Sequence, residues 1–219
     1  MPRQLNRRPP TKKVAQKILI ACEGSKTEPI YFESIRNDLR LPTLKIIVLR
    51  HQGKTDPRSI IERLIEERQQ MKDNQEWTKD DHAWAVFDGD EHIEKSRDKW
   101  QSAISRAKSQ KINLAITNPC FELWYLLHFQ DNLSQVTRDK LVKLLGKHIS
   151  NYDKSMCLYP EPLKSLTEQA IERANKIAKQ IAANELDEHS NPCCSGLPDL
   201  ISDLLPKKSK SMTTNESID

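Results

Sequence analysis

The segment Lys17-Ile18-Leu19-Ile20-Ala21-Cys22-Glu23-Gly24 decides the fold, because it joins a short β-branched apolar run to an abrupt glycine stop. Such a run is typical of a strand that is buried on both faces, as in a parallel sheet. The helical pattern that follows at 27–39 has Thr27 as its predicted N-cap and Pro29 in its first turn. The chain is therefore predicted to open with a strand, a tight connection and a helix.

Short apolar runs and amphipathic helical patterns keep alternating up to about residue 130. Further strands are predicted at 44–49, 83–87 and 112–116, and further helices at 57–72, 91–109 and 120–129. The connections between strands are long enough for parallel pairing, and this alternation is typical of a parallel sheet with helices on both faces. After residue 130 the strand pattern ends, and helices are predicted at 135–145, 163–186 and 197–205.

The fold class predicted from this order is α/β, with a parallel sheet flanked by helices and a helical C-terminal extension. Residues 16–130 are predicted to form the α/β core, and residues 131–205 a helical region of the same domain. Residues 1–15 are basic, residues 206–219 are polar, and both are predicted to be disordered tails.

The net charge of +4 originates in the N-terminal tail. Subtracting the five tail cations from +4 leaves −1 for the rest of the chain. A nearly neutral folded part implies that affinity for a polyanion depends on the tail or on a local basic patch. The tail cations are Arg3, Arg7, Arg8, Lys12 and Lys13.

Composition also indicates a compartment. No apolar stretch approaches the roughly 18 residues of a membrane span, and no apolar segment of a secretory signal follows the basic N-terminus. The 5 cysteines are odd in number and lie mostly within apolar runs. These features predict a cytoplasmic protein with reduced thiols and no membrane association.

Acidic side chains follow two of the predicted strands. Glu23 comes directly after the first strand, and Asp88 and Asp90 come directly after the third. Ligands of open parallel sheets bind beyond the carboxyl ends of the strands, so these carboxylates are expected to meet at one edge. Crowded carboxylates repel each other unless a cation or a proton intervenes, and oxygen ligands suit Mg²⁺ or Mn²⁺ better than zinc. The alternative interpretation is that Asp88-Gly89-Asp90 is only a turn.

Several segments resemble the RloB-like proteins, a branch of the Toprim superfamily. The resemblance lies in Cys22-Glu23-Gly24-Ser25-Lys26-Thr27-Glu28-Pro29 with Tyr31-Phe32, in Val86-Phe87-Asp88-Gly89-Asp90-Glu91-His92, in Thr117-Asn118-Pro119-Cys120-Phe121-Glu122-Leu123-Trp124 with Leu127-His128-Phe129, and in Ser190-Asn191-Pro192. It extends over about residues 16–205, and the first three segments in this order are its most specific part.

The resemblance implies a Toprim-like core and particular roles for the acidic residues. It implies that Glu23 acts in acid/base chemistry or metal binding, and that Asp88 and Asp90 bind Mg²⁺ or Mn²⁺. It further implies a nuclease in anti-phage abortive infection that cleaves RNA, such as transfer RNA, rather than DNA. An ATPase partner protein and a homodimer are the associated expectations.

Further residues were assigned to this predicted site by their positions. Lys26 is expected to neutralise a phosphate oxygen beside the N-terminus of the helix after Thr27. Lys54 is a weaker candidate for phosphate binding. The secondary candidates, for which a structural role is the alternative, are Glu28, His92, Asn118, Glu122 and His128.

Other patterns do not support a function. Gly53-Lys54-Thr55 imitates a nucleotide-binding loop, but Val48 stands where that motif requires glycine. The adjacent pair Cys193-Cys194 with His189 lacks the spacing of a structural zinc site. The main alternative to a nuclease is a non-catalytic subunit that senses nucleic acid or regulates a defence ATPase. A topoisomerase or primase is disfavoured by the short chain.

Overall fold

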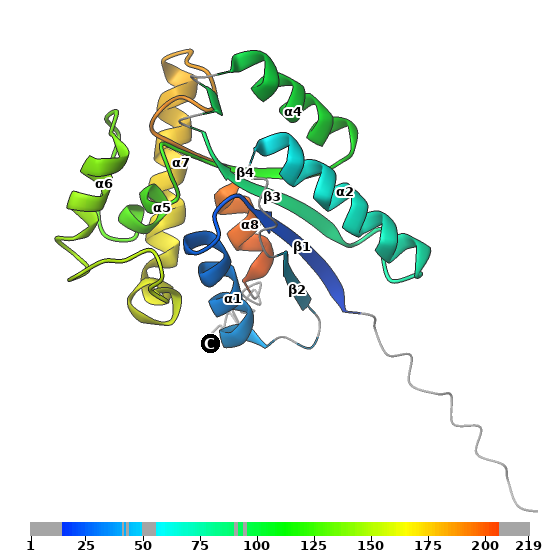
Figure 1. The fold of residues 1–219 in the computed structure, drawn as a ribbon. Coiled ribbons are helices and arrows are strands. Elements are labelled where there is room, and N and C mark those ends of the chain that lie inside the picture. The colour runs from blue at the N-terminus through cyan, green and yellow to red at the C-terminus, as the bar shows by residue number, and fades with distance from the viewer. Residues whose placement is uncertain are drawn as a thin grey trace, which may run out of the picture.

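The computed structural model of the protein describes residues 15–40, 42, 44–49, 56–89, 92–93 and 96–205 (Figure 1). The two predicted tails fall outside these ranges, apart from Ala15. Within the described ranges, no helix is both long enough and apolar enough to cross a membrane.

A five-stranded sheet in the order β2-β1-β3-β4-β5 forms the centre of the molecule. β1 to β4 run parallel to one another, whereas β5 runs antiparallel to β4. The strands are β1 (Gln16–Cys22), β2 (Leu44–Leu49), β3 (His82–Asp88), β4 (Asn113–Asn118) and β5 (Cys193–Ser195). The predicted α/β class is confirmed, and the expectation that no strand follows residue 130 is wrong.

β5 escaped prediction because its three residues are too few to show a period-two pattern. It pairs through Cys194 with Thr117 of β4, and Gly196 follows it directly. Gly196 has a φ of +68°, and a Cβ atom there would lie 2.0 Å from the carbonyl oxygen of Leu114. Only glycine therefore lets the chain turn this close to β4.

Helices cover both faces of the sheet (Figure 1). The regular helices are α1 (Thr27–Leu39), α2 (Pro57–Asp73), α4 (Arg97–Ser109), α5 (Glu122–Leu127), α6 (Arg138–Leu145), α7 (Thr167–Ala183) and α8 (Leu197–Leu204). A π-helical turn at Tyr159–Leu163 and a 3₁₀ turn at Lys164–Leu166 lead into α7. The predicted helices at 120–129 and 163–186 are shorter in the structure, as α5 and α7, and Ser96 is not helical within the helix predicted at 91–109, whose regular part is α4.

The alternation of side chains along β1 divides the core into two layers. Leu19 and Ala21 pack with α2 and α4 on one face, whereas Ile18 and Ile20 pack with α1, α5, α7 and α8 on the other. Ile18, Leu19 and Ile20 are fully buried, as expected for a central strand. The second layer joins the first 130 residues to the C-terminal helices in one continuous hydrophobic cluster.

The predicted starts of α1, α2 and α8 match the structure, whereas α5, α6 and α7 begin two to four residues later than predicted. α1 begins at Thr27, so Lys26 and not Thr27 occupies the N-cap position, and no side chain caps this helix. At α2 the Asp56 carboxylate accepts a hydrogen bond from the backbone N–H of Ser59 at 3.1 Å, which is a regular N-cap.

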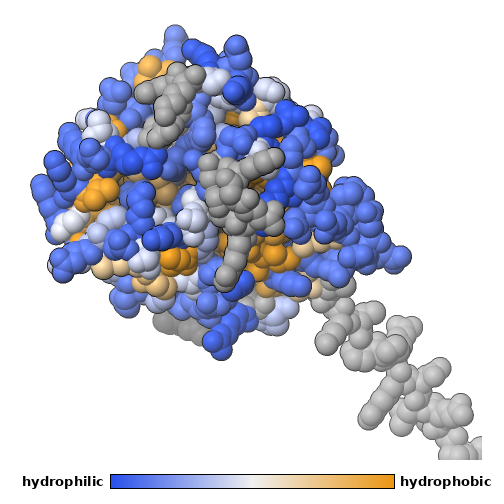
Figure 2. Space-filling view, viewed as in Figure 1, coloured by the Kyte–Doolittle hydropathy of each residue, from blue (hydrophilic) through white to orange (hydrophobic). Residues whose placement is uncertain are grey.

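On the face drawn in Figure 2, hydrophilic residues predominate and the apolar areas are small and separate.

Candidate active site

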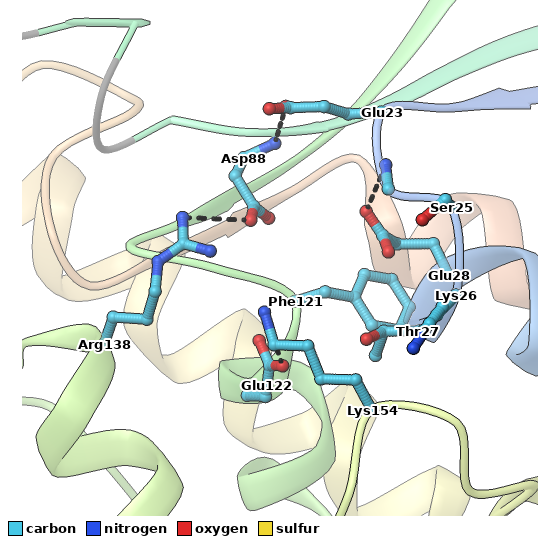
Figure 3. Close-up of a pocket in the computed structure, with 11 residues that line it drawn as sticks. Glu23, Ser25, Lys26, Thr27, Glu28, Asp88, Phe121, Glu122, Arg138 and Lys154 are labelled. Atoms are coloured by element: carbon cyan, nitrogen blue, oxygen red, sulfur yellow. Dashed lines mark hydrogen bonds and ion pairs between the residues drawn. The ribbon is translucent and has the colours of Figure 1, made fainter. Parts of the chain in front are cut away.

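A cavity of about 410 Å³ lies at the carboxyl ends of β1 and β3, where the sequence predicts the site (Figure 3). One wall is the turn between β1 and α1, and the opposite wall comes from α6 and the loop after it. The described residues that line it are Glu23, Gly24, Ser25, Lys26, Thr27, Glu28, Asp88, Phe121, Glu122, Arg138 and Lys154.

Glu23 connects the ends of the two central strands. Its backbone N–H donates to the carbonyl oxygen of Val86 at 2.9 Å. Its Oε2 accepts a hydrogen bond from the backbone N–H of Asp88 at 2.9 Å, and its Oε1 lies 3.1 Å from Nε2 of His92. The Glu23 side chain is 21% exposed, so the carboxylate is fixed in orientation and still reaches solvent.

Glu28 packs directly onto the glycine of the first turn. Its Oε1 accepts a hydrogen bond from the backbone N–H of Gly24 at 3.1 Å. A Cβ atom at Gly24 would lie 2.1 Å from the other carboxylate oxygen, so a larger residue here would displace the Glu28 carboxylate. Burial, assisted by the charges of Glu23 and Glu122, raises the pKa of Glu28 to about 7. Its carboxyl group is therefore poised between the neutral and charged forms near neutral pH.

Asp88 is the last residue of β3 and lies on the cavity wall. Its Oδ1 accepts a hydrogen bond from the Thr117 hydroxyl at 2.9 Å, and its Oδ2 lies 3.3 Å from Nη2 of Arg138. Burial is the main factor that raises the pKa of Asp88 well above its usual range, and the charges of Glu28 and Glu23 add to it. Arg138 and Thr117 act in the opposite direction without cancelling this effect.

Glu122 forms the deepest acidic position. It is the first residue of α5, and its side chain is only 2% exposed. Its Oε1 accepts a hydrogen bond from the Tyr152 hydroxyl at 3.1 Å and lies 3.6 Å from Nζ of Lys154. Both partners come from the loop that follows α6, and they provide the buried Glu122 carboxylate with a hydrogen bond and an ion pair.

The structure thus brings together five of the predicted site residues on one cavity. These are Glu23, Lys26, Glu28, Asp88 and Glu122. His92 does not line the cavity, but its Nε2 lies 3.1 Å from Oε1 of Glu23. Asp90 and Lys54 lie outside the described residues. The roles assigned to all of these side chains stay predictions.

Two secondary candidates lie elsewhere. The Asn118 side chain donates to the carbonyl oxygen of His189 at 2.8 Å and borders a separate cavity. His128 is buried at the end of α5, where its Nδ1 donates to the carbonyl oxygen of Trp124 at 2.9 Å. Burial lowers the pKa of His128 to about 4, so the ring is neutral. In both positions the side chain is hydrogen-bonded to a backbone carbonyl oxygen, as expected for a structural role.

The donor set suits a hard divalent cation. Within the described ranges, no group of three or more histidine, cysteine, aspartate or glutamate side chains is placed to hold a metal ion, and Asp90 falls outside those ranges. Mg²⁺, however, usually takes one or two carboxylates and completes its shell with water and phosphate oxygens. Asp88 with Glu23 fits such a partial shell. The pKa values of Asp88 and Glu28 are raised first by burial and then by the neighbouring carboxylates, and a cation would favour the charged form of both groups.

Three residues of the site were missed by the sequence analysis. Thr117 is the register partner of Asp88 across β3 and β4, so a closer comparison of the strand ends could have identified it. Arg138 and Lys154 come from the segment around α6, which follows no strand. No spacing in the sequence relates that segment to the acidic residues.

Comparison with known proteins identifies a family. Neither the curated proteins nor the solved structures include a match to this chain. The model of the RloB-like protein family matches residues 18–204, which is most of the chain and includes both walls of the cavity. The chain therefore belongs to the RloB-like family.

Proposed function

We propose that this protein is a metal-dependent nuclease that hydrolyses phosphodiester bonds. The observation that carries the proposal is the junction of Glu23 and Asp88 at the ends of adjacent parallel strands, on a cavity that also holds Glu28 and Glu122. This edge is where parallel sheets bind ligands, and its acidic oxygens suit Mg²⁺ or Mn²⁺. The Toprim relationship expected from the sequence agrees with this arrangement and is part of the proposal.

Each side chain has a definite task in this reaction. When bound, the divalent ion supplies Lewis-acid stabilisation for the charge that develops on the phosphate oxygens. Asp88, at the end of β3, would hold that ion, and Asp90 is the second ligand expected from the sequence. Glu23, oriented by the Asp88 N–H and by His92, accepts the proton of the attacking water. Lys26, exposed on the cavity wall, neutralises a phosphate oxygen of the substrate.

The proposed biological setting depends on membership in the RloB-like family. We propose an effector of anti-phage abortive infection in the cytoplasm that cleaves RNA, transfer RNA in particular, rather than DNA. An ATPase partner that controls the nuclease, and a homodimer of this chain, belong to the same proposal.

A cleavage assay tests the proposal directly. Purified full-length protein is incubated with transfer RNA, plasmid and single-stranded DNA in Mg²⁺, Mn²⁺ or EDTA. We expect metal-dependent cleavage of RNA that Asp88→Asn and Glu23→Gln reduce by at least about a hundredfold, since each removes charge at the reacting centre. Glu172→Gln, on the exposed surface of α7, is the matched control. Cleavage that persists in EDTA or in Asp88→Asn refutes the proposal.

A non-catalytic sensor or regulatory subunit is the second candidate. The ion pair between Arg138 and Asp88 favours it, because this contact already neutralises part of the acidic charge without a metal. In that case protection against phage survives Asp88→Asn, and no preparation, with or without a partner ATPase, cleaves nucleic acid. The two candidates are separated by testing phage protection and cleavage with the same variant.

A further inference from the structure

Two cations from one segment face the acidic wall of the cavity (Figure 3). Arg138 is the first residue of α6, a helix whose start is fixed by the Thr137 hydroxyl, which accepts from the Lys140 N–H at 3.3 Å. Lys154 lies in the loop that follows α6. The segment that carries both cations is therefore anchored at its start and reaches over the cavity from the side opposite the Glu23–Glu28 turn.

The acids are buried and the cations are more exposed. Arg138 is 37% exposed where its partner Asp88 is 14% exposed, and Lys154 is 51% exposed where Glu122 is 2% exposed. An anion that enters the cavity from solvent consequently meets the cationic groups first. Both cations line the same cavity of about 410 Å³ and pair with different acidic residues.

Arg138 and a divalent cation compete for the same carboxylate. Nη2 of Arg138 lies 3.3 Å from Oδ2 of Asp88, and both residues line the cavity. Two cations beside one carboxylate repel each other, so a metal ion at Asp88 would displace the guanidinium. The displaced guanidinium presents several N–H donors in a planar fork, a geometry that matches phosphate oxygens.

We propose that Arg138 and Lys154 bind the phosphate of the substrate, and that Arg138 exchanges Asp88 for this phosphate when the cation binds. This inference rests on the proposed nuclease function. It adds the substrate-binding half of the site, which the segment around α6 supplies, and it predicts effects of opposite sign on the two ligands.

The test measures both ligands on the full chain. Mn²⁺ affinity is measured by calorimetry, and affinity for a short fluorescein-labelled single-stranded RNA is measured by anisotropy in Ca²⁺. For Arg138→Gln we expect Mn²⁺ affinity to rise several-fold and RNA affinity to fall by about tenfold, the loss of one charge-assisted contact. For Lys154→Gln we expect a similar loss of RNA affinity and unchanged Mn²⁺ affinity, because Lys154 pairs with Glu122 and not with Asp88.

Two further variants control for charge and for folding. Arg58→Gln on α2 removes an equal charge from an exposed ion pair with Glu62, outside the residues that line the cavity, and should change neither affinity. Arg138→Lys keeps the charge and loses the planar fork, so it should restore part of the RNA affinity. Unchanged RNA affinity in Arg138→Gln, or a fall in its Mn²⁺ affinity, overturns the inference.

The same experiment separates this inference from the nuclease proposal. If Arg138→Gln shows the opposed shifts in Mn²⁺ and RNA affinity but wild-type protein does not cleave RNA in Mn²⁺, the exchange is supported and the nuclease is refuted. Wild-type protein that cleaves RNA while Arg138→Gln binds and cleaves it normally refutes the exchange alone.

Discussion

Replacing Glu28 by glutamine tests whether burial and the neighbouring carboxylates raise the pKa of Glu28 in the folded protein. Glutamine has the same shape and keeps an oxygen to accept from the Gly24 N–H, which the carboxylate accepts from at 3.1 Å. The glutamine side chain does not titrate. Any effect of the amide group itself on the free energy of unfolding is therefore the same at every pH. The informative quantity is therefore how the difference in unfolding free energy between variant and wild type changes with pH.

The magnitude follows from the raised pKa. In the folded protein the pKa of Glu28 is about 7, against 4.5 for a free side chain. The folded state thus holds this proton more tightly, so its contribution to stability is fully present below pH 4.5 and is lost as the pH rises through 7. At about 1.36 kcal/mol per pKa unit, the linkage relation gives a change of about 2.5 kcal/mol between pH 5 and pH 8. Relative to wild type, Glu28→Gln should become more stable by that amount.

Urea unfolding followed by circular dichroism at pH 5, 6.5 and 8 measures this difference. Exposed Glu172→Gln on α7 serves as the control for the loss of one carboxylate. Added Mn²⁺ at pH 8 should shrink the advantage of the glutamine variant, because a cation favours the charged carboxylate. A difference that stays constant from pH 5 to pH 8, or that changes in favour of wild type, would falsify the argument.

Three further predictions concern other positions. Gly196→Ala should lower the free energy of unfolding by about 2 kcal/mol or more, because a Cβ atom at this positive φ would meet the Leu114 carbonyl oxygen at 2.0 Å. The control is Gly146→Ala, where a Cβ atom would meet its nearest neighbour at 3.4 Å, and it should be nearly neutral in the same urea titration. His128→Phe should flatten the acid side of the stability curve, because the pKa of His128 is lowered to about 4 and wild type therefore loses stability as the pH falls from 6.5 towards 4; equal slopes in the two proteins contradict this. Thr117→Val should weaken Mn²⁺ binding by about tenfold, since the hydroxyl that donates to Asp88 at 2.9 Å is lost, and Thr117→Ser should restore the calorimetric affinity.

The acidic half of the site was predictable because it depends on strand ends. Each strand from β1 to β4 is a short apolar run, and a parallel sheet brings the carboxyl ends of such runs to one edge. Glu23 and Asp88 are neighbours because β1 pairs directly with β3, with Cys22 opposite Val86. The order of the strands in the sheet was not predicted, but the shared edge follows from parallel pairing in any order.

The basic half could not be predicted in the same way. Arg138 and Lys154 reach the cavity through the packing of α5 against α6, and tertiary packing of this kind leaves no periodic trace in the sequence. The N-cap of α1 was misplaced by one residue for a related reason. Thr27 is a good capping residue, but it is buried as the first residue of the helix, and the tight turn around Gly24 determines where the helix begins.

The late strand β5 has a consequence for how the protein is made. β4 pairs with β3 on one side and with Cys193–Ser195 on the other. While the ribosome is still synthesising the chain, β4 remains an open sheet edge until these residues emerge, and open edges invite pairing with other chains. The helix α8 then follows within two residues of β5 and packs into the hydrophobic cluster. Emergence of residues 193–204 from the ribosome is thus the step that closes this sheet edge.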